Sequence, residues 1–251
     1  GFFVSNFAGK TAFAAINLIM PFIMILGGIG FMIGTGGSAL VSYTLGTGDK
    51  EKANRYFSML VYFTILAGIL LTVLGIIFVR PIAELFGADE SMMDTCVLYG
   101  RIVIAFNAAF MLQNIFQSFF VVAEKPRLGL IVTIAAGVTN MVLDALFVGV
   151  FKWGIVGAAL ATGISQSIGG LLPLLYFALP NNSPLQLTRT GFELAPLLKA
   201  SSNGCSELMS NVASSLIGIM YNYQLMRLGG ENAVATYGVL MYIQFVFIAI
   251  F

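Results

Sequence analysis

The segment NMVLDALFVGVFKWGIVGAALATGISQ, residues 140–166, decides how this sequence is interpreted. It is almost wholly apolar, yet Asn140 and Asp144 lie four residues apart, as do Thr162 and Gln166 beyond a short hinge. A spacing of four places two side chains on the same face of a helix. If both runs cross a bilayer, a carboxyl group at this depth is costly and indicates a functional site. The first question is therefore whether these runs are membrane spans.

The composition answers that question. Hydrophobic residues make up 59% of the 251 residues, charged residues 9%, and the mean hydropathy is +0.95. A soluble domain has about 45–50% apolar and about 25% charged residues. The apolar residues also fall in blocks of the ~20 residues that a membrane helix needs. The sequence therefore predicts an all-α polytopic membrane protein, and the net charge of +1 argues against a nucleic-acid partner.

Hydrophobic blocks and polar interruptions predict the order of the spans. The expected spans are 11–43, 56–79, 96–123, 130–150, 155–179, 205–228 and 233–251, with residues 1–7 as the end of an earlier helix. Residues 80–94 mix acidic and apolar residues, which predicts a short helix at the membrane interface. Three domains follow, namely a bundle over 1–179, a cytoplasmic linker over 180–203 and the start of a second lobe over 204–251.

The distribution of basic residues predicts the orientation. Alternate loops hold seven lysines and arginines on one side and five on the other. The first set is Lys50, Lys52, Arg55, Lys125, Arg127, Arg189 and Lys199. Because basic loops are retained in the cytoplasm, we expect this side to be cytoplasmic.

An internal repeat relates the two ends of the chain. FAGKTAFAAINLIMPF (7–22) aligns without gaps to LGGENAVATYGVLMYI (228–243), and the pairs Gly9/Gly230 and Met20/Met241 are identical. An even number of helices separates the two segments, which predicts a parallel repeat about an axis along the membrane normal, an arrangement typical of transporters. Within the first span, Gly30 and Gly34 have the small-xxx-small spacing that favours close helix packing.

Asp144 is the main candidate for chemistry. A carboxyl group in surroundings of low dielectric is favoured in its neutral form, so it can bind a proton. It could equally hold Na⁺ with help from the neutral oxygens of Asn140 and Thr162. The alternative is a structural carboxylate satisfied by a neighbouring polar group. Glu207 is a second candidate, although near the start of its span it could also snorkel or cap.

Other chemistry finds little support in the sequence. Gly9-Lys10-Thr11 ends like a phosphate-binding loop, but valine replaces the first glycine of that motif and no strand precedes it. The sequence contains no histidine, no metal-ligand cluster and no nucleophile–base pattern. We therefore expect no enzyme and no cofactor, and transport driven by an ion gradient.

Several motifs resemble one known family. NxxLDxxF at 140–147 and GAAxATxxSQ at 157–166 resemble the fifth and sixth helices of the multidrug and toxic compound extrusion (MATE) transporters, in particular their bacterial drug-efflux branch. FAGKTAFAAINLIMP (7–21) and GTGDKEKAN (46–54) are similar to that family's first two loop regions. GGENAVATYGV (229–239) is similar to the matching loop of its second half.

The resemblance implies a protein of twelve helices in two six-helix lobes. It implies that this chain holds the N-terminal lobe, with its first helix mostly missing, and the start of a second, parallel-repeat lobe. The family's ion site uses an aspartate on the first helix, which would fall before Gly1, and residues matched here by Asn140, Asp144 and Thr162. Glu207 resembles an acidic residue on the seventh helix, in a shifted register. By itself such a chain is not expected to transport.

The resulting functional hypothesis is multidrug efflux in a bacterial plasma (inner) membrane. Organic cations would leave in exchange for H⁺ or Na⁺ by alternating access, with the lipid bilayer as the surroundings and a monomer as the full-length state. We expect the substrate cavity to involve Gln113, Gln117, Gln166 and Glu207.

Two alternatives remain open. The first is a lipid-linked oligosaccharide flippase of the same superfamily, which would line its cavity with arginine and lysine. The second is a non-transporting membrane scaffold or an intramembrane enzyme.

Overall fold

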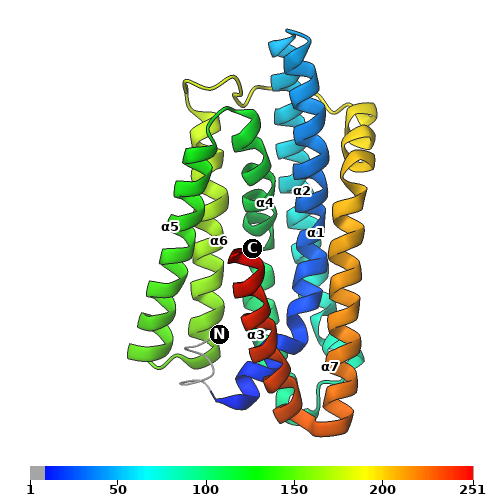
Figure 1. Ribbon diagram of the computed structural model, residues 1–251, viewed down its shortest axis with the longest axis vertical. Coiled ribbons are helices and arrows are strands. Elements are labelled where there is room, and N and C mark those ends of the chain that lie inside the picture. Colours follow the sequence, from blue (N-terminus) through cyan, green and yellow to red (C-terminus); the bar gives the residue numbers. More distant parts are fainter. Residues whose placement is uncertain (1–8, 251) are drawn as a thin grey trace.

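The computed structural model describes residues 9–250, which form an elongated bundle of helices along one long axis (Figure 1). Its helices are α1 (Lys10–Gly46), α2 (Lys50–Leu85), α3 (Glu90–Ala105), α4 (Asn107–Val122), α5 (Pro126–Asp144), the six-residue π-helix η2 (Ala145–Val150), α6 (Gly154–Ala178) and α7 (Leu194–Ile250). Within this part of the chain, four helices are long and apolar enough to cross a membrane, and the bent pair of α3 and α4 passes the same test when it is counted as one span. The prediction of an all-α polytopic membrane protein is confirmed.

Glycines let α1 and α4 approach closely. A Cβ added to Gly30 would lie 2.8 Å from the Cα of Met111, and one added to Gly34 would lie 3.1 Å from the Cα of Ile115. The first distance leaves no room for a Cβ and the second is tighter than most Cβ contacts, so the two backbones lie very close along this stripe. The predicted role of Gly30 and Gly34 in packing is confirmed, and α4 is the partner helix.

The predicted interfacial helix over residues 80–94 is wrong. The helix α2 continues through Pro81 to Leu85, and Gly87, at φ +92°, ends it with its N–H bonded to the oxygen of Glu84 at 3.0 Å. Asp89 then caps α3 by accepting a hydrogen bond from the N–H of Met92 at 3.0 Å. A left-handed glycine and an N-cap are strong boundary signals, and they outweigh the amphipathic pattern.

The predicted single span over residues 96–123 consists of two helices, α3 and α4, which meet at Phe106 with a bend of 53°. The N–H of Phe106 bonds to the oxygen of Val103, three residues back, so the regular i to i−4 ladder is interrupted there. A Cβ on Gly163 would overlap the Phe106 ring, which places the bend directly against α6.

The repeat predicted between the two ends of the chain has a backbone counterpart. Gly9 precedes α1 with φ 91° and ψ 168°, and Gly230 interrupts α7 with φ 60° and ψ −155°. Only glycine adopts this conformation readily. Both turns lie at the same end of the bundle, at the bottom of Figure 1. The chain thus turns in the same way at the two aligned positions.

The segment between α6 and α7 is fixed to α2. The N–H of Gln186 bonds to the Asn54 side chain at 2.9 Å, and the N–H of Thr188 bonds to the Ser58 hydroxyl at 2.8 Å. Since α7 begins at Leu194, the last ten residues of the predicted linker are helical. Below this segment, an aromatic cluster of Phe57, Phe116, Phe119 and Phe177 fills the core, with ring centroids 4.8 to 6.5 Å apart.

The turn between α4 and α5 contains a strained glutamate. Glu124 has φ +56°, a left-handed conformation that costs a residue with a Cβ about 1 kcal/mol. The N–H groups of Glu124 and Lys125 bond back to the oxygens of Val121 and Phe120, at 3.1 and 2.9 Å, which is the hydrogen-bond pattern of a Schellman cap. Glycine is the usual residue at this position.

We therefore expect Glu124→Gly to stabilise the protein by about 1 kcal/mol, because glycine adopts this conformation without strain. Thermal unfolding in detergent measures the change. As a control, Glu90→Gly in the first turn of α3 should lower the unfolding temperature, since there glycine only adds backbone freedom. An unfolding temperature of Glu124→Gly below that of the wild type would contradict the interpretation.

Candidate functional site

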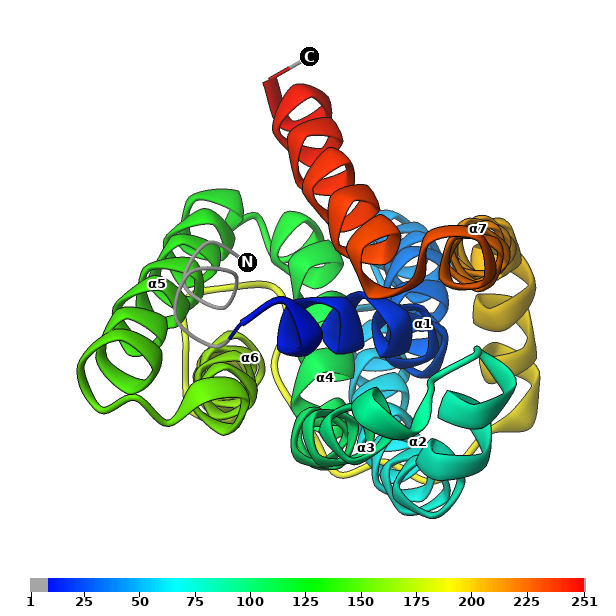
Figure 2. The ribbon, with the colours of Figure 1, turned by 90° about the horizontal axis from the view of Figure 1, so that it is seen from below.

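Five of the seven predicted site residues line one cavity. It has a volume of about 430 Å³ and lies among α1, α3, α4, α5 and α6. Asn140 and Asp144 enter it from α5, Thr162 and Gln166 from α6, and Gln113 from α4. Figure 2 shows α5 and α6 side by side on one flank of α1 and α4, which leaves this position between the pairs. Side chains far apart in sequence therefore share one polar space.

Asp144 is buried, with 9% of its surface exposed. Its Oδ1 atom has no hydrogen-bond partner among the described residues. A buried polar atom without a partner is costly, and such atoms are few in native proteins. The π-helix η2 begins at the next residue, and π-helical turns occur frequently at functional sites. The structural alternative requires neighbours that satisfy both carboxylate oxygens, and Oδ1 has no such neighbour among the described residues.

Side chains with neutral oxygens line the same cavity as the carboxylate. The Thr162 hydroxyl donates its proton to the oxygen of Ala158 at 3.0 Å, so the lone pairs of the Thr162 oxygen remain available to a cation or a hydrogen-bond donor. Gln166 Oε1 is buried without a partner among the described residues, like Asp144 Oδ1. Oxygen ligands of this kind suit a proton or a hard cation such as Na⁺. No group of three or more Cys, Asp or Glu side chains within residues 9–250 could hold a transition metal.

The structure does not bring Gln117 and Glu207 to this cavity, so a substrate role for these two stays a prediction. Gln117 lies one turn beyond Gln113 towards the C-terminal end of α4, and its side chain is exposed. Glu207 is exposed on α7, whose main packing partner is α1. Spacing in the sequence indicated which residues share one face of a helix. It did not indicate which of those residues reach the cavity.

Most of the remaining wall could not be identified from the sequence. Phe13, Met20, Tyr99 and Phe110 come from three different helices and supply its apolar and aromatic surface. No spacing pattern links them to Asp144, so only the packing of the helices reveals them. By contrast, the two asparagines of α4, Asn107 and Asn114, are buried elsewhere in the bundle.

A second cavity, of about 370 Å³, lies between α1 and α7. Met20 and Met241, identical in the sequence repeat, both line it, and Met20 also lines the first cavity. The Asn222 side chain donates to the oxygen of Asn17 at 3.0 Å, while the Oδ1 atoms of Asn211 and Asn222 lack partners among the described residues. The two cavities are therefore neighbours that share a flexible thioether wall.

Comparison with known proteins gives consistent matches. The family model described as MatE matches residues 1–146. The chain is 25% identical over 241 residues to the multidrug export protein MepA of Staphylococcus saprophyticus, covering 95% of this chain and 53% of the relative. It is 29% identical over 252 residues to the probable multidrug resistance protein YoeA of Bacillus subtilis, with 94% and 52% covered. The chain thus spans about half the length of these curated relatives.

Solved structures share the arrangement of helices. An inward-facing multidrug resistance MATE family transporter of the MOP superfamily superposes with a TM-score of 0.92 at 21% identity, over 98% of this chain and 56% of that one. The outward-facing conformation of such a transporter gives a TM-score of 0.82 at 21% identity, over 94% and 53%. A structure of the MATE multidrug transporter DinF-BH gives 0.83 at 25% identity, over 95% and 54%.

Proposed function

The chain belongs to the MatE family, and from this premise we propose that the full-length protein is a secondary active multidrug efflux transporter. It exports organic cations in exchange for H⁺ or Na⁺ by alternating access between two lobes. The names of the curated relatives, which are multidrug export and resistance proteins, support this proposal.

One observation carries the proposal. Asp144, a carboxylate with an unpartnered buried oxygen among the described residues, opens into the same cavity as Asn140, Thr162 and Gln166, inside a membrane-spanning bundle. A carboxylate within a membrane span is costly and by default indicates a functional site. Here Asp144 binds the coupling ion, and Asn140 and Thr162 provide neutral oxygens around it.

The exchange follows from charge. With Asp144 ionised, the cavity attracts an organic cation, whose apolar parts contact Phe13, Met20 and Phe110. Binding of H⁺ or Na⁺ at Asp144 neutralises the carboxylate and removes this attraction. The ion drives the conformational change only through unequal affinity for the inward- and outward-facing states. Flexible methionine and aromatic rings suit substrates of different shapes.

We further propose the membrane orientation and the setting. The seven basic residues of the more basic loops all lie at the end of the bundle that holds the loop between α1 and α2, which favours this end as cytoplasmic. The relatives are bacterial proteins, so the setting is the bacterial plasma membrane. The full-length protein acts as a monomer, since each lobe supplies half of the transport path.

The lining of the Asp144 cavity argues against the flippase alternative. None of its described lining residues is lysine or arginine, so it offers no cation to a pyrophosphate. A scaffold without transport activity would not need the buried carboxylate.

The test uses full-length protein in proteoliposomes loaded with ethidium. We expect an imposed pH gradient or an imposed Na⁺ gradient to drive export well above that of protein-free vesicles, and the effective gradient identifies the ion. A control with both gradients dissipated should show no net export. If neither gradient moves ethidium while a lipid-linked sugar crosses the bilayer, the efflux proposal is wrong.

A further inference from the structure

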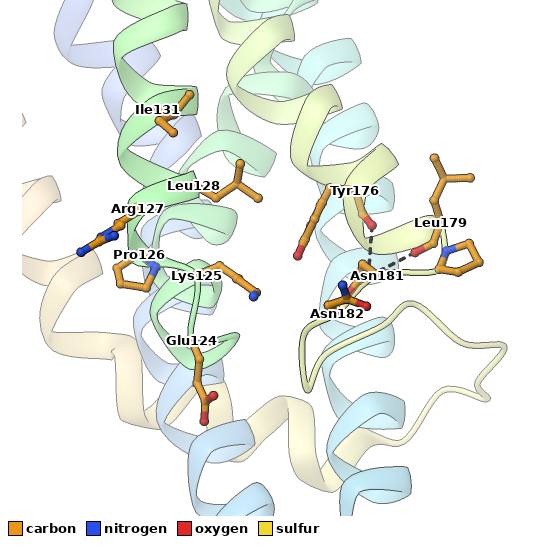
Figure 3. A pocket seen from close by; sticks show the side chains of 11 residues that line it. Glu124, Lys125, Pro126, Arg127, Leu128, Ile131, Tyr176, Leu179, Asn181 and Asn182 are labelled. Atoms are coloured by element: carbon orange, nitrogen blue, oxygen red, sulfur yellow. Dashed lines mark hydrogen bonds between the residues drawn. The ribbon is translucent and has the colours of Figure 1, made fainter.

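A large open pocket lies at the end of the bundle predicted to be cytoplasmic, well away from the coupling site. Its volume is about 860 Å³, and its walls come from the turn between α4 and α5, the first turns of α5, the last turn of α6 and the residues 179–182 that follow it. Figure 3 shows Lys125 on one side facing Tyr176 and Asn182 on the other. An ammonium, a phenol hydroxyl and an amide thus surround one space.

The donors of this pocket are free to bind a ligand. Within residues 9–250, the ion pairs are Arg55–Glu193 and Arg80–Glu84, so Lys125 has no carboxylate partner there. The Asn181 side chain bonds to the backbone oxygens of Tyr176 and Leu179, each at 3.1 Å (Figure 3). The first of these bonds satisfies one of the last carbonyls of α6, and α5 presents its positive N-terminal end to the pocket. The local field therefore favours an anion.

The net charge at this end of the bundle also favours an anion. Its loops and helix ends carry seven basic side chains and four acidic ones, so there is an excess of three positive charges. The acidic residues are Asp49, Glu51, Glu124 and Glu193. Glu124 is the one acidic residue that lines the pocket within the described chain, and it is exposed. Arg127 also lines the pocket, although its side chain leaves α5 on the side away from α6; Lys125 is the cation whose side chain points towards Tyr176 and Asn182 (Figure 3).

The apolar part of the pocket identifies the kind of anion. Leu128, Ile131 and Leu179 form its wall, and Ile131 and Leu179 are each 61% exposed. Below them, the outer face of α5 and α6 is apolar and exposed, including Leu130, Ile134, Leu172 and Leu175. A phospholipid with its phosphate at Lys125 would therefore have its acyl chains along an exposed apolar surface of the membrane-spanning helices. A free phosphate would gain nothing from this surface.

We propose that this pocket binds the phosphate of an anionic phospholipid headgroup, with Lys125, Tyr176 and Asn182 as donors and the α5–α6 face as the acyl-chain surface. Basic pockets between helix ends on the cytoplasmic side are suited to such headgroups. The bound lipid would link the α4–α5 turn to the end of α6, two elements that frame the helices of Asp144 and Thr162.

Native mass spectrometry of the full chain in detergent, titrated with phosphatidylglycerol, tests the proposal. We expect Lys125→Gln to weaken lipid binding about fivefold, the contribution of one basic residue at an anionic surface. Glu124→Gln should strengthen it, because a carboxylate beside the phosphate is removed. Opposite signs from two neighbouring residues would not arise from a general loss of structure, and thermal unfolding verifies that both variants fold.

The matched control is Lys50→Gln, which removes the same charge at the same end of the bundle but outside the pocket. We expect it to leave phosphatidylglycerol binding unchanged. Equal losses for Lys50→Gln and Lys125→Gln would overturn the site, as would equal affinity for zwitterionic phosphatidylcholine. Binding of glycerol 3-phosphate alone, with the same dependence on Lys125, would overturn the lipid as the ligand.

Discussion

Asp144→Asn in the full-length protein is expected to reduce gradient-driven export of ethidium to the level of protein-free vesicles. Asparagine has nearly the shape of the protonated carboxyl group but cannot release a proton or pair with Na⁺. An ion that no longer distinguishes the two states cannot shift their populations, so the gradient loses its effect. Because the buried charge is removed and not added, the thermal stability should be unchanged or higher.

Matched variants separate this interpretation from a structural role. Asp94→Asn removes an exposed carboxylate of α3 outside the cavity, and should leave export intact. Thr162→Val, which removes one oxygen from the cavity, should weaken the coupling ion's apparent affinity about tenfold, whereas Thr162→Ser should retain it. Export by Asp144→Asn at the wild-type rate would show that the carboxylate is structural.

The second large effect concerns the contact between α1 and α7. A Cβ on Gly204 would overlap the backbone oxygen of Met32 and lie 3.0 Å from the backbone nitrogen of Gly36. A Cβ on Gly36 would in turn overlap the backbone oxygen of Ala200. Because backbone atoms cannot rotate away as a side chain can, even one added methyl group must push the helices apart.

Gly204→Ala is therefore expected to destabilise the protein by about 1–3 kcal/mol, the usual cost of overpacking, even though alanine favours helices. Thermal unfolding in detergent measures this loss. The control is Gly46→Ala at the end of α1, where an added Cβ meets nothing within 4 Å, and it should stabilise the protein slightly. Equal stability of Gly204→Ala and the wild type would show that α1 and α7 separate easily in solution.

Features that depend on interactions within one helix could be predicted from the sequence. Helix class, the existence of most spans and the glycine stripe at Gly30 and Gly34 follow from composition and local periodicity, which one helix carries by itself. Helix boundaries were less certain. The amphipathic pattern over residues 80–94 suggested one helix, but Gly87 and Asp89 end one helix and begin another there.

The candidate site divides in the same way. Pairs four residues apart, Asn140 with Asp144 and Thr162 with Gln166, had to share helix faces, and the composition made a buried carboxylate notable. These features were available from the sequence because they depend only on helical geometry and on the cost of burying charge. The role of Asp144 in ion coupling stays a prediction until export is measured.

Only the tertiary structure decided which helix faces meet. It placed Gln113 in the cavity of Asp144, left Gln117 and Glu207 outside it, and added Phe13, Tyr99 and Phe110 from helices with no sequence link to α5. It also revealed the bend at Phe106 and the close contact of Gly36 with α7. Such contacts depend on the volumes of residues distant in the chain, and no local pattern records how two helix surfaces fit together.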